Sequence, residues 1–414
     1  MKIMVTAASF SSDMSGIQRH AFNLVQCLLR RPEISRVDLV VAPWQTKLAR
    51  TVGIQHDARL KIYVADMEQG SLSRNLWYYR KLPLLVAQRQ PDLVHLTYPV
   101  PIHAGSFRCA TVLTLHDLYP YEIPQNFGFP QVLFNRLILK QCLRNVNAIA
   151  CVSDTTMASM RQYASKSTQQ KAVRIYNCVK PQPQTIVRPP IAGWSGESFL
   201  LCVAQHRRNK NIVLLIHAFH CLLRTSSISP TTKLVVVGME GPETRRIRQA
   251  ISDLGIGANV LLLHGLSEPE LRWCYVRCEV LIVPSKVEGF GLPVAEALMV
   301  GCRVVCSDIA ALREIGGAHC HYVTLGANEE EALASAIRTA LQEPPKDPIT
   351  LPHLSADCLA CQYLDFYRQL LGLQLSVSTA TRAAACSPTT PEAKSSDVNK
   401  PSQAMEQGGL GGCI

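Results

Sequence analysis

Hydrophobic and polar positions alternate along this chain between short apolar runs and longer amphipathic stretches. A short apolar run bounded by polar or turn residues is typical of a strand that is buried on both faces. Such runs occupy residues 2–7, 37–41, 93–96, 111–115 and 147–152, and then 199–203, 233–238, 260–263, 280–284 and 303–306. Between them, apolar residues recur every three or four positions, as in 16–30 and 212–223, which predicts amphipathic helices. Strands that alternate with helices predict parallel pairing, and therefore an α/β fold with doubly wound sheets.

A proline-rich segment, residues 181–190, separates the two sets of strands. It holds four prolines in ten residues (PQPQTIVRPP), which excludes a helix or a central strand. We therefore expect an N-terminal domain over 1–180, a stiff linker over 181–190 and a C-terminal domain over 191–355. An amphipathic pattern predicts a last helix over 356–372. Residues 376–414 are expected to form a disordered tail, because they lack the apolar content needed to fold.

Composition and charge bear on the location and the partners of the protein. The chain of 414 residues has no apolar run long enough to span a membrane, and the apolar stretch at its N-terminus is too short for a signal peptide. We therefore expect a cytoplasmic protein. The net charge of +11 favours an anionic membrane, phosphorylated substrates or nucleic acid as partners. No nucleic-acid-binding motif accompanies this charge, so we expect no nucleic acid among them.

The 16 cysteines indicate neither disulfides nor a metal site. Most lie inside apolar runs, as Cys202 does, where they act as small buried side chains in a reducing compartment. Cys358 and Cys361 form a C-x-x-C, and Cys274 and Cys278 lie four positions apart. Neither pair is accompanied by a second pair at zinc spacing, so we expect no metal.

The most specific chemical signal is the segment 288–296 (EGFGLPVAE), which follows the predicted strand 280–284. Gly289 and Gly291 allow the backbone to turn sharply and to approach a ligand closely. Pro293 suits the first turn of a helix, where its missing N–H group has no cost. A glycine loop between a strand and a helix N-terminus binds anions, because unpaired N–H groups point outward there.

Two carboxylates, Glu288 and Glu296, lie eight positions apart in this segment. Glu288 falls in the loop and Glu296 on the expected first turn of the helix, so both can face the anion site. Carboxylates only accept hydrogen bonds, which suits sugar hydroxyls. The segment therefore predicts a pocket for a phosphate that carries sugar-like groups. For Glu296 taken alone, a solvated position on the helix is an equal alternative.

A basic loop, Gln205-His-Arg-Arg-Asn-Lys210, follows the predicted strand 199–203. Ligands bind at the carboxyl ends of parallel strands, so Arg207, Arg208 and Lys210 are candidates to bind a diphosphate. The alternative is an ordinary basic surface loop. The sequence leaves open which of the two arginines accompanies the lysine.

The segment 283–296 (VPSKVEGFGLPVAE) resembles the E-x7-E signature of the large family of retaining, nucleotide-sugar-dependent glycosyltransferases that includes many mannosyl- and glucosyltransferases. Further matching stretches follow in the family's order over roughly residues 1–370. They are Ser15-Gly16-Ile17, Leu115-His116-Asp117-Leu118, Cys151-Val152-Ser153, Asn209-Lys210-Asn211, Val236-Val237-Gly238, Ser307-Asp308-Ile309 and Arg313-Glu314. The resemblance implies the GT-B fold, in which two Rossmann-like domains face a cleft, with a last helix that often packs back on the first domain.

The resemblance also implies roles for individual residues. Glu288 would bind the hydroxyls of the donor sugar, Glu296 those of the ribose, and Lys210 the diphosphate. His116 would face the reacting centre as a neutral acceptor, with a structural histidine paired to Asp117 as the alternative. The other implied donor-binding positions are Gly16, Arg207, Arg208, Gly238, Gly289, Phe290, Gly291 and Leu292, with Glu240 as a further candidate. No metal and no cofactor is implied, because fixed cations would stabilise the leaving diphosphate.

These features predict a hexosyltransferase that uses a nucleotide-diphosphate sugar such as GDP-mannose or a UDP-hexose. The resemblance implies retention by front-face attack, in which the departing phosphate oxygen takes the acceptor proton. The expected acceptor is a surface polysaccharide or a lipid-linked glycan. A catalytically silent sugar-nucleotide-binding subunit and a GT-B epimerase are the alternatives.

Residues 135–144 (NRLILKQCLR) place Arg136, Lys140 and Arg144 on one helical stripe beside apolar residues. A basic amphipathic helix can rest on an anionic membrane or approach a lipid-linked diphosphate. Peripheral contact with the membrane is therefore one interpretation of this segment. The other is a packed helix with a solvated outer face.

Overall fold

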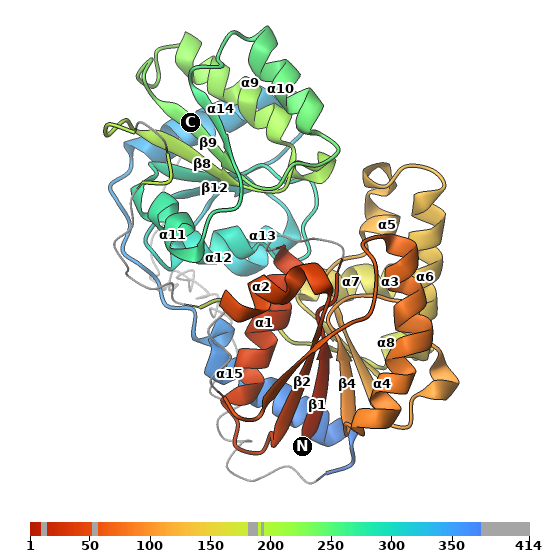
Figure 1. Ribbon diagram of the computed structural model, residues 1–414. Coiled ribbons are helices and arrows are strands. Elements are labelled where there is room, and N and C mark those ends of the chain that lie inside the picture. The colour runs from red at the N-terminus through yellow and green to blue at the C-terminus, as the bar shows by residue number, and fades with distance from the viewer. Residues whose placement is uncertain (10–14, 52–56, 181–188, 192–193, 374–414) are drawn as a thin grey trace, which may run out of the picture.

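Two parallel sheets, one in each half of the chain, organise the structure (Figure 1). The computed structural model describes residues 1–9, 15–51, 57–180, 189–191 and 194–373. The described strands follow the order β3-β2-β1-β4-β5-β6-β7 in the first sheet and β10-β9-β8-β11-β12-β13 in the second. Every recorded pairing is parallel. This confirms the predicted α/β class with two doubly wound sheets.

The strands of the first sheet all lie before residue 175. They are β1 (Lys2–Thr6), β2 (Arg36–Val41), β3 (Leu60–Val64), β4 (Leu93–Leu96), β5 (Ala110–Leu115), β6 (Ala148–Cys151) and β7 (Ala172–Arg174). The strands of the second sheet all lie after residue 198. They are β8 (Phe199–Val203), β9 (Lys233–Val237), β10 (Val260–Leu263), β11 (Val280–Val283), β12 (Val304–Ser307) and β13 (His321–Val323).

Helices connect the strands in both halves. In the first half they are α1 (Gly16–Leu29), α2 (Thr46–Thr51), α3 (Ser71–Leu76), α4 (Leu82–Arg89), α5 (Tyr119–Glu122), α6 (Gln131–Asn145), α7 (Asp154–Tyr163) and α8 (Lys166–Gln169). In the second half they are α9 (Ile212–Arg224), α10 (Thr244–Asp253), α11 (Glu268–Arg277), α12 (Leu292–Leu298), α13 (Ala310–Gly316), α14 (Glu329–Gln342) and α15 (Ala356–Leu370). Shorter helical turns include η4 (Pro124–Asn126) and η5 (Arg208–Lys210).

The predicted strands are confirmed to within one or two residues, and β4, β8 and β10 have the predicted bounds. Three strands escaped prediction, and all three lie at sheet edges or next to them. β3 contains Lys61 and is only partly buried, so its hydrophobic pattern is weak. β7 and β13 have three residues each, which is too short for a periodicity to be recognised.

Alternate residues of each strand enter different cores. In β1, Ile3 and Val5 belong to a cluster that also contains α1 and α15, whereas Met4 faces the cluster beneath α4 and α6. In the second sheet, Leu200 and Leu234 pack with α9 and α14 on one face. The first cluster continues from one sheet to the other without a break, so apolar packing joins the two halves.

The last helix, α15, lies on the first half of the molecule beside α1 (Figure 1). Arg30 at the end of α1 forms an ion pair with Asp357 of α15, and Tyr367 of α15 is hydrogen-bonded to the buried His95 of β4. The predicted linker 181–190 lies mostly outside the described residues, and the predicted disordered tail 376–414 lies entirely outside them.

Candidate active site between the two domains

The candidate site lies where the strand order of the second sheet reverses. β8 and β11 are neighbours there, yet the chain continues from β8 towards β9 on one side and from β11 towards β12 on the other. Loops that leave two such strands diverge and create a crevice at their carboxyl ends, where α/β proteins bind ligands. The basic loop follows β8 and the glycine loop follows β11. The topology therefore places Lys210 and Glu288 side by side.

Lys210 and Glu288 form an ion pair in this crevice. Nζ of Lys210 lies 2.5 Å from Oε1 of Glu288, and the hydroxyl of Ser285 donates to the same oxygen at 2.7 Å. Glu288 is buried and Lys210 is largely buried. A partly desolvated pair of this kind fixes both side chains in position before any ligand arrives.

Backbone contacts hold the two loops together. The N–H group of Lys286 donates to the carbonyl of Asn209 at 2.7 Å, and the side-chain amide of Asn209 donates to the carbonyl of Val287 at 3.2 Å.

The two arginines of the basic loop differ in position, since Arg208 is exposed and Arg207 is half-buried. Arg207 therefore lies closer to the crevice, where its charge acts on Asp117 of the first domain.

His116 follows β5 and faces the glycine loop from the first domain. Its Nε2 atom lies 2.9 Å from the carbonyl oxygen of Thr97. Because a carbonyl can only accept, the proton is on Nε2, and Nδ1 keeps its lone pair. Burial lowers the pKa of His116 to about 4, so the ring is neutral at physiological pH. Among the described residues the structure records no hydrogen bond between His116 and Asp117, and the ring of His116 instead contacts that of His20, with 4.7 Å between centroids.

Asp117 accepts a hydrogen bond from the N–H group of Tyr119 at 3.1 Å. The pKa of Asp117 is raised to about 6, mainly by burial and less by the neighbouring Glu122, while the hydrogen bond from Tyr119 and the charges of Arg207 and Lys210 oppose the rise. This carboxylate of the first domain therefore faces the cations of the second domain. The sequence analysis assigned it no role of its own in the site.

Glu296 lies on α12, but not on its first turn as predicted. α12 begins at Leu292, so Glu296 is the fifth residue and belongs to the second turn. Its two carboxylate oxygens have different partners. Oε1 accepts from the guanidinium of Arg19 on α1, and Oε2 accepts from the hydroxyl of Tyr275 at 2.8 Å. Glu296 is buried, which rules out the alternative of a solvated helix position.

Close backbone approach explains Gly289. A Cβ atom at this position would lie 1.9 Å from the carbonyl oxygen of His116, so any other residue would push the two domains apart. Gly291 has a φ of +99°, a conformation that favours glycine, and Pro293 occupies the first turn of α12 as predicted. The glycines of the motif therefore serve the contact between domains as well as the turn.

The remaining predicted positions are less closely tied to the crevice. Gly16 is the first residue of α1, and a Cβ atom there would meet nothing within 4 Å. Close packing requires a glycine at position 238, because an added Cβ atom would lie 1.9 Å from the carbonyl oxygen of Ala204. Phe290 is buried against Tyr176, with 5.9 Å between ring centroids. Leu292 is partly buried at the start of α12.

Further polar contacts hold the two domains together around the crevice. The hydroxyl of Ser153 donates to the carbonyl of Gly289 at 2.5 Å. Glu314 accepts from the N–H group of Asp154 at 2.8 Å, and so satisfies an unpaired donor in the first turn of α7. The amide of Asn126 on η4 donates to Asn209 at 3.0 Å. The structure thus describes the two domains in contact around the candidate site.

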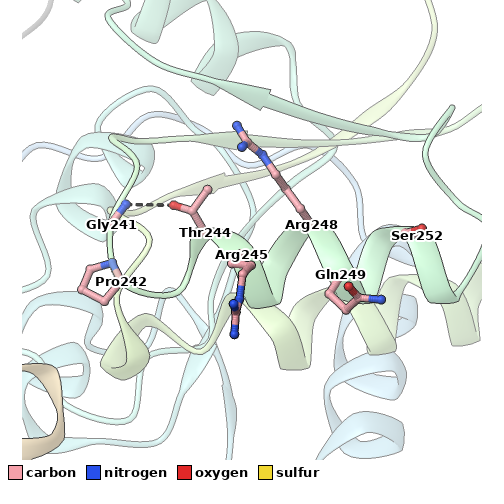
Figure 2. A pocket seen from close by; sticks show the side chains of 7 residues that line it. All are labelled: Gly241, Pro242, Thr244, Arg245, Arg248, Gln249 and Ser252. Atoms are coloured by element: carbon pink, nitrogen blue, oxygen red, sulfur yellow. Dashed lines mark hydrogen bonds between the residues drawn. The ribbon is translucent and has the colours of Figure 1, made fainter.

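A separate surface hollow of about 500 Å³ lies along α10 (Figure 2). Its lining includes Thr244, Arg245 and Arg248, and the N–H group of Gly241 donates to Thr244 at 2.8 Å. None of the residues predicted for the site lines this hollow. Glu240, the further candidate for the nucleotide pocket, forms an exposed ion pair with Arg248 instead.

Sequence reasoning missed Arg19, Asp117, Tyr275 and Ser285 as members of the site. Tyr275 on α11 and Arg19 on α1 belong to no loop motif, and only the tertiary packing brings them to Glu296. Ser285 and Asp117 lie next to recognised motifs, so their position in the sequence could have indicated that they belong to the site.

Among the described residues, no group of three His, Cys, Asp or Glu side chains could hold a metal ion. None of the described helices has the length and apolar character that a membrane span requires.

Two family models match this chain, one in each half. Residues 14–182 match the model described as Glycosyltransferase Family 4, and residues 188–349 match the model described as Glycosyl transferases group 1. The first match covers β2 to β7 of the first sheet and His116, and the second covers both the basic loop and the glycine loop.

Individual proteins are also similar to this chain, with sequence identities below 30%. The O-antigen chain mannosyltransferase RfbU of Salmonella typhimurium is 27% identical over 268 residues, which cover 64% of this chain and 70% of that protein. The O-antigen chain mannosyltransferase B of Escherichia coli is 23% identical over 369 residues, covering 83% and 91%. The structure of Anabaena Alr3699/HepE in complex with UDP and glucose has a TM-score of 0.59 at 17% identity, covering 93% of this chain and 98% of that one. At that identity the likeness shows a shared fold alone.

Proposed function

We propose that this protein transfers a hexosyl group from a nucleotide-diphosphate sugar to an acceptor hydroxyl, because its two halves match the family models described as Glycosyltransferase Family 4 and Glycosyl transferases group 1. The transfer retains the configuration at the anomeric carbon and needs no metal. GDP-mannose is the donor that we favour, since two of the similar proteins bear the name of O-antigen chain mannosyltransferases. UDP-hexoses are the next candidates.

The observation that carries this proposal is the pairing of Lys210 with Glu288 opposite His116. The ammonium group can neutralise the leaving diphosphate, while the carboxylate accepts hydrogen bonds from the hydroxyls of the donor sugar. His116 is neutral, and its Nδ1 lone pair can accept a further sugar hydroxyl. These groups fix the donor in place and stabilise the charge that develops on the phosphate.

Retention follows in this proposal from front-face attack. The departing phosphate oxygen takes the proton of the acceptor hydroxyl, so no protein base is required on that face of the sugar. Asp117 faces Arg207 and Lys210 from the first domain, so its carboxylate lies beside the cations that would bind the diphosphate. The acceptor in this proposal is a lipid-linked glycan or a growing surface polysaccharide.

A surface on α6 and the residues before it suits a lipid-linked acceptor. Phe129, Phe134 and Leu137 are 84%, 58% and 63% exposed, which is unusual for large apolar side chains so close together. Lys140 and Arg144 continue the same helical face and are exposed. Arg136 differs from them, because it donates to the carbonyl of Pro120 and lies over the ring of Tyr121. We therefore propose that this surface, residues 129–144, rests on an anionic membrane.

A donor panel tests the activity. The protein is incubated with GDP-mannose, UDP-glucose or UDP-N-acetylglucosamine and a polyprenyl-diphosphate-linked sugar, and release of nucleoside diphosphate is measured. We expect release from one donor that depends on the acceptor, and NMR of the product should show a retained anomeric configuration. K210A serves as the control and should release nucleoside diphosphate at least tenfold more slowly.

The same assay separates the alternatives. A catalytically silent subunit would bind a sugar nucleotide in calorimetry but release no nucleoside diphosphate with any acceptor. An epimerase would change the sugar without an acceptor, which NMR of the unfractionated mixture detects. Acceptor-independent conversion, or binding without release, would contradict the proposed transfer.

A further inference from the structure

A buried ion pair joins helix α1 of the first domain to helix α12 of the second. The guanidinium of Arg19 donates to Oε1 of Glu296, and the hydroxyl of Tyr275 donates to Oε2. The side chain of Arg19 is 20% exposed and that of Glu296 is 7% exposed. Arg19 reaches this position from the first turn of α1, which Ser15 caps by accepting from the N–H group of Gln18.

This ion pair by itself contributes little to the stability of the contact between the domains. Removing two charges from water is costly, and an apolar contact of the same volume is often equally stabilising. An unbroken apolar cluster already joins the two sheets. We therefore look for a role of the carboxylate itself, and the guanidinium is one of the groups that fix its orientation.

The carboxylate of Glu296 can accept further hydrogen bonds in this arrangement. An ionised carboxylate offers about four acceptor positions, of which Arg19 and Tyr275 occupy one on each oxygen. One position on each oxygen remains, which matches the two neighbouring hydroxyls of a ribose. Arg19 does not compete with a ribose for Glu296, because all three partners can donate to the carboxylate at once.

We propose that Arg19 is a positioning residue for the nucleotide: it orients Glu296 towards the ribose and makes ribose binding depend on contact between the two domains. This inference rests on the proposed function. Arg19 belongs to the first domain and Glu296 to the second, so separation of the domains would release the carboxylate from its guanidinium. Nucleotide affinity and domain contact are therefore coupled through this pair.

The inference predicts a specific kinetic pattern. Arg19 acts on the ribose end of the donor, whose contacts are the same in the ground state and the transition state. Its loss should therefore raise the KM for the donor about tenfold and leave kcat within about twofold. Loss of Lys210, which faces the leaving phosphate, should instead lower kcat.

Isothermal titration calorimetry of the full chain with UDP and GDP tests the inference directly. R19A should bind the preferred nucleotide about tenfold more weakly, R19K should lie between R19A and the native protein, and Y275F should weaken binding by a smaller factor. R30A is the matched control, because Arg30 lies at the other end of α1 and pairs with Asp357 on a different helix. Its nucleotide affinity should stay within twofold of native.

Several outcomes would overturn the inference. If R19A has a lower melting temperature but native affinity per folded molecule, Arg19 has a structural role only. Equal losses in R19A and R30A would show that α1 acts as a whole. If the native protein binds neither UDP nor GDP, the proposed function fails together with this inference, whereas native binding that R19A leaves intact refutes the inference alone.

Discussion

Nζ of Lys210 lies 2.5 Å from Oε1 of Glu288, so one ion pair links the loops that leave two neighbouring strands of the second sheet. Each of the two charges has the other as its partner. A sugar diphosphate that enters the crevice can bind the ammonium with its phosphate and the carboxylate with its hydroxyls. The pair is therefore complementary to the two parts of the donor, the leaving diphosphate and the sugar that is transferred.

K210A and E288A should each lower turnover at least tenfold while the protein remains folded, because each removes one half of this pair. Their effects should not multiply in the double variant, since the two side chains act as a unit. Steady-state release of nucleoside diphosphate measures the rates, and circular dichroism checks the fold. Near-native activity in both single variants would contradict the assignment of the site.

The two arginines of the basic loop should differ in importance. Arg207 is half-buried with its charge acting on Asp117, whereas Arg208 is exposed. We expect R207A to reduce kcat/KM for the donor at least tenfold and R208A to stay within about twofold. The two variants remove the same charge one position apart, so each is the control for the other. The reverse order of effects would show that the loop changes its conformation when the donor binds.

Asp117 should make the folded state less stable at neutral pH. Its pKa rises from 3.8 to about 6 on folding, so the folded protein binds more protons than the unfolded chain between these values. The resulting penalty is absent below about pH 4 and complete above about pH 6. D117N removes the penalty and can still accept from the N–H group of Tyr119. It should therefore raise the free energy of unfolding on the order of 3 kcal/mol at pH 8.

The matching measurement is chemical denaturation of the native protein and D117N at pH 8 and pH 4. The difference between them should be several times smaller at the lower pH, where Asp117 is protonated in the folded protein and roughly half protonated in the unfolded chain. An equal difference at both pH values would mean that titration of Asp117 is not the cause. Reduced transfer activity in the more stable variant would fit a site residue that is kept at a cost in stability.

The surface formed by residues 129–144 should bind anionic vesicles. Native protein should co-sediment with vesicles that contain phosphatidylglycerol and not with pure phosphatidylcholine. The double variants F134S/L137S and K140E/R144E should each bind at least tenfold more weakly. The first removes apolar side chains that enter the interface, and the second reverses two basic residues, each of which contributes about 1 kcal/mol at a membrane. The substituted side chains are exposed, so the fold should survive.

V276S is the control for the apolar substitutions. Val276 on α11 is 50% exposed but lies in the second domain. Its replacement should leave vesicle binding unchanged. If the α6 variants sediment as the native protein does, the membrane proposal fails and the exposed apolar side chains need another explanation.

The sequence by itself determined the two sheets and the two loops of the second domain. Apolar runs such as 199–203 and 280–284 form buried parallel strands because hydrophobic residues on both faces leave few alternatives. The glycines and the proline of 289–293 then require a turn into a helix, because their backbone preferences are local properties. The juxtaposition of Lys210 and Glu288 followed from the general rule for the carboxyl ends of such strands.

Only the tertiary structure decided which side chains complete the site. Arg19 reaches Glu296 from 277 positions away, and no local pattern of α1 marks it among the arginines of the chain. The same holds for Gly289. Only glycine fits there, because the carbonyl of His116 in the other domain occupies the space of a side chain. Such contacts depend on how two separately patterned domains dock, and a one-dimensional pattern of burial contains no information about the partner across a crevice.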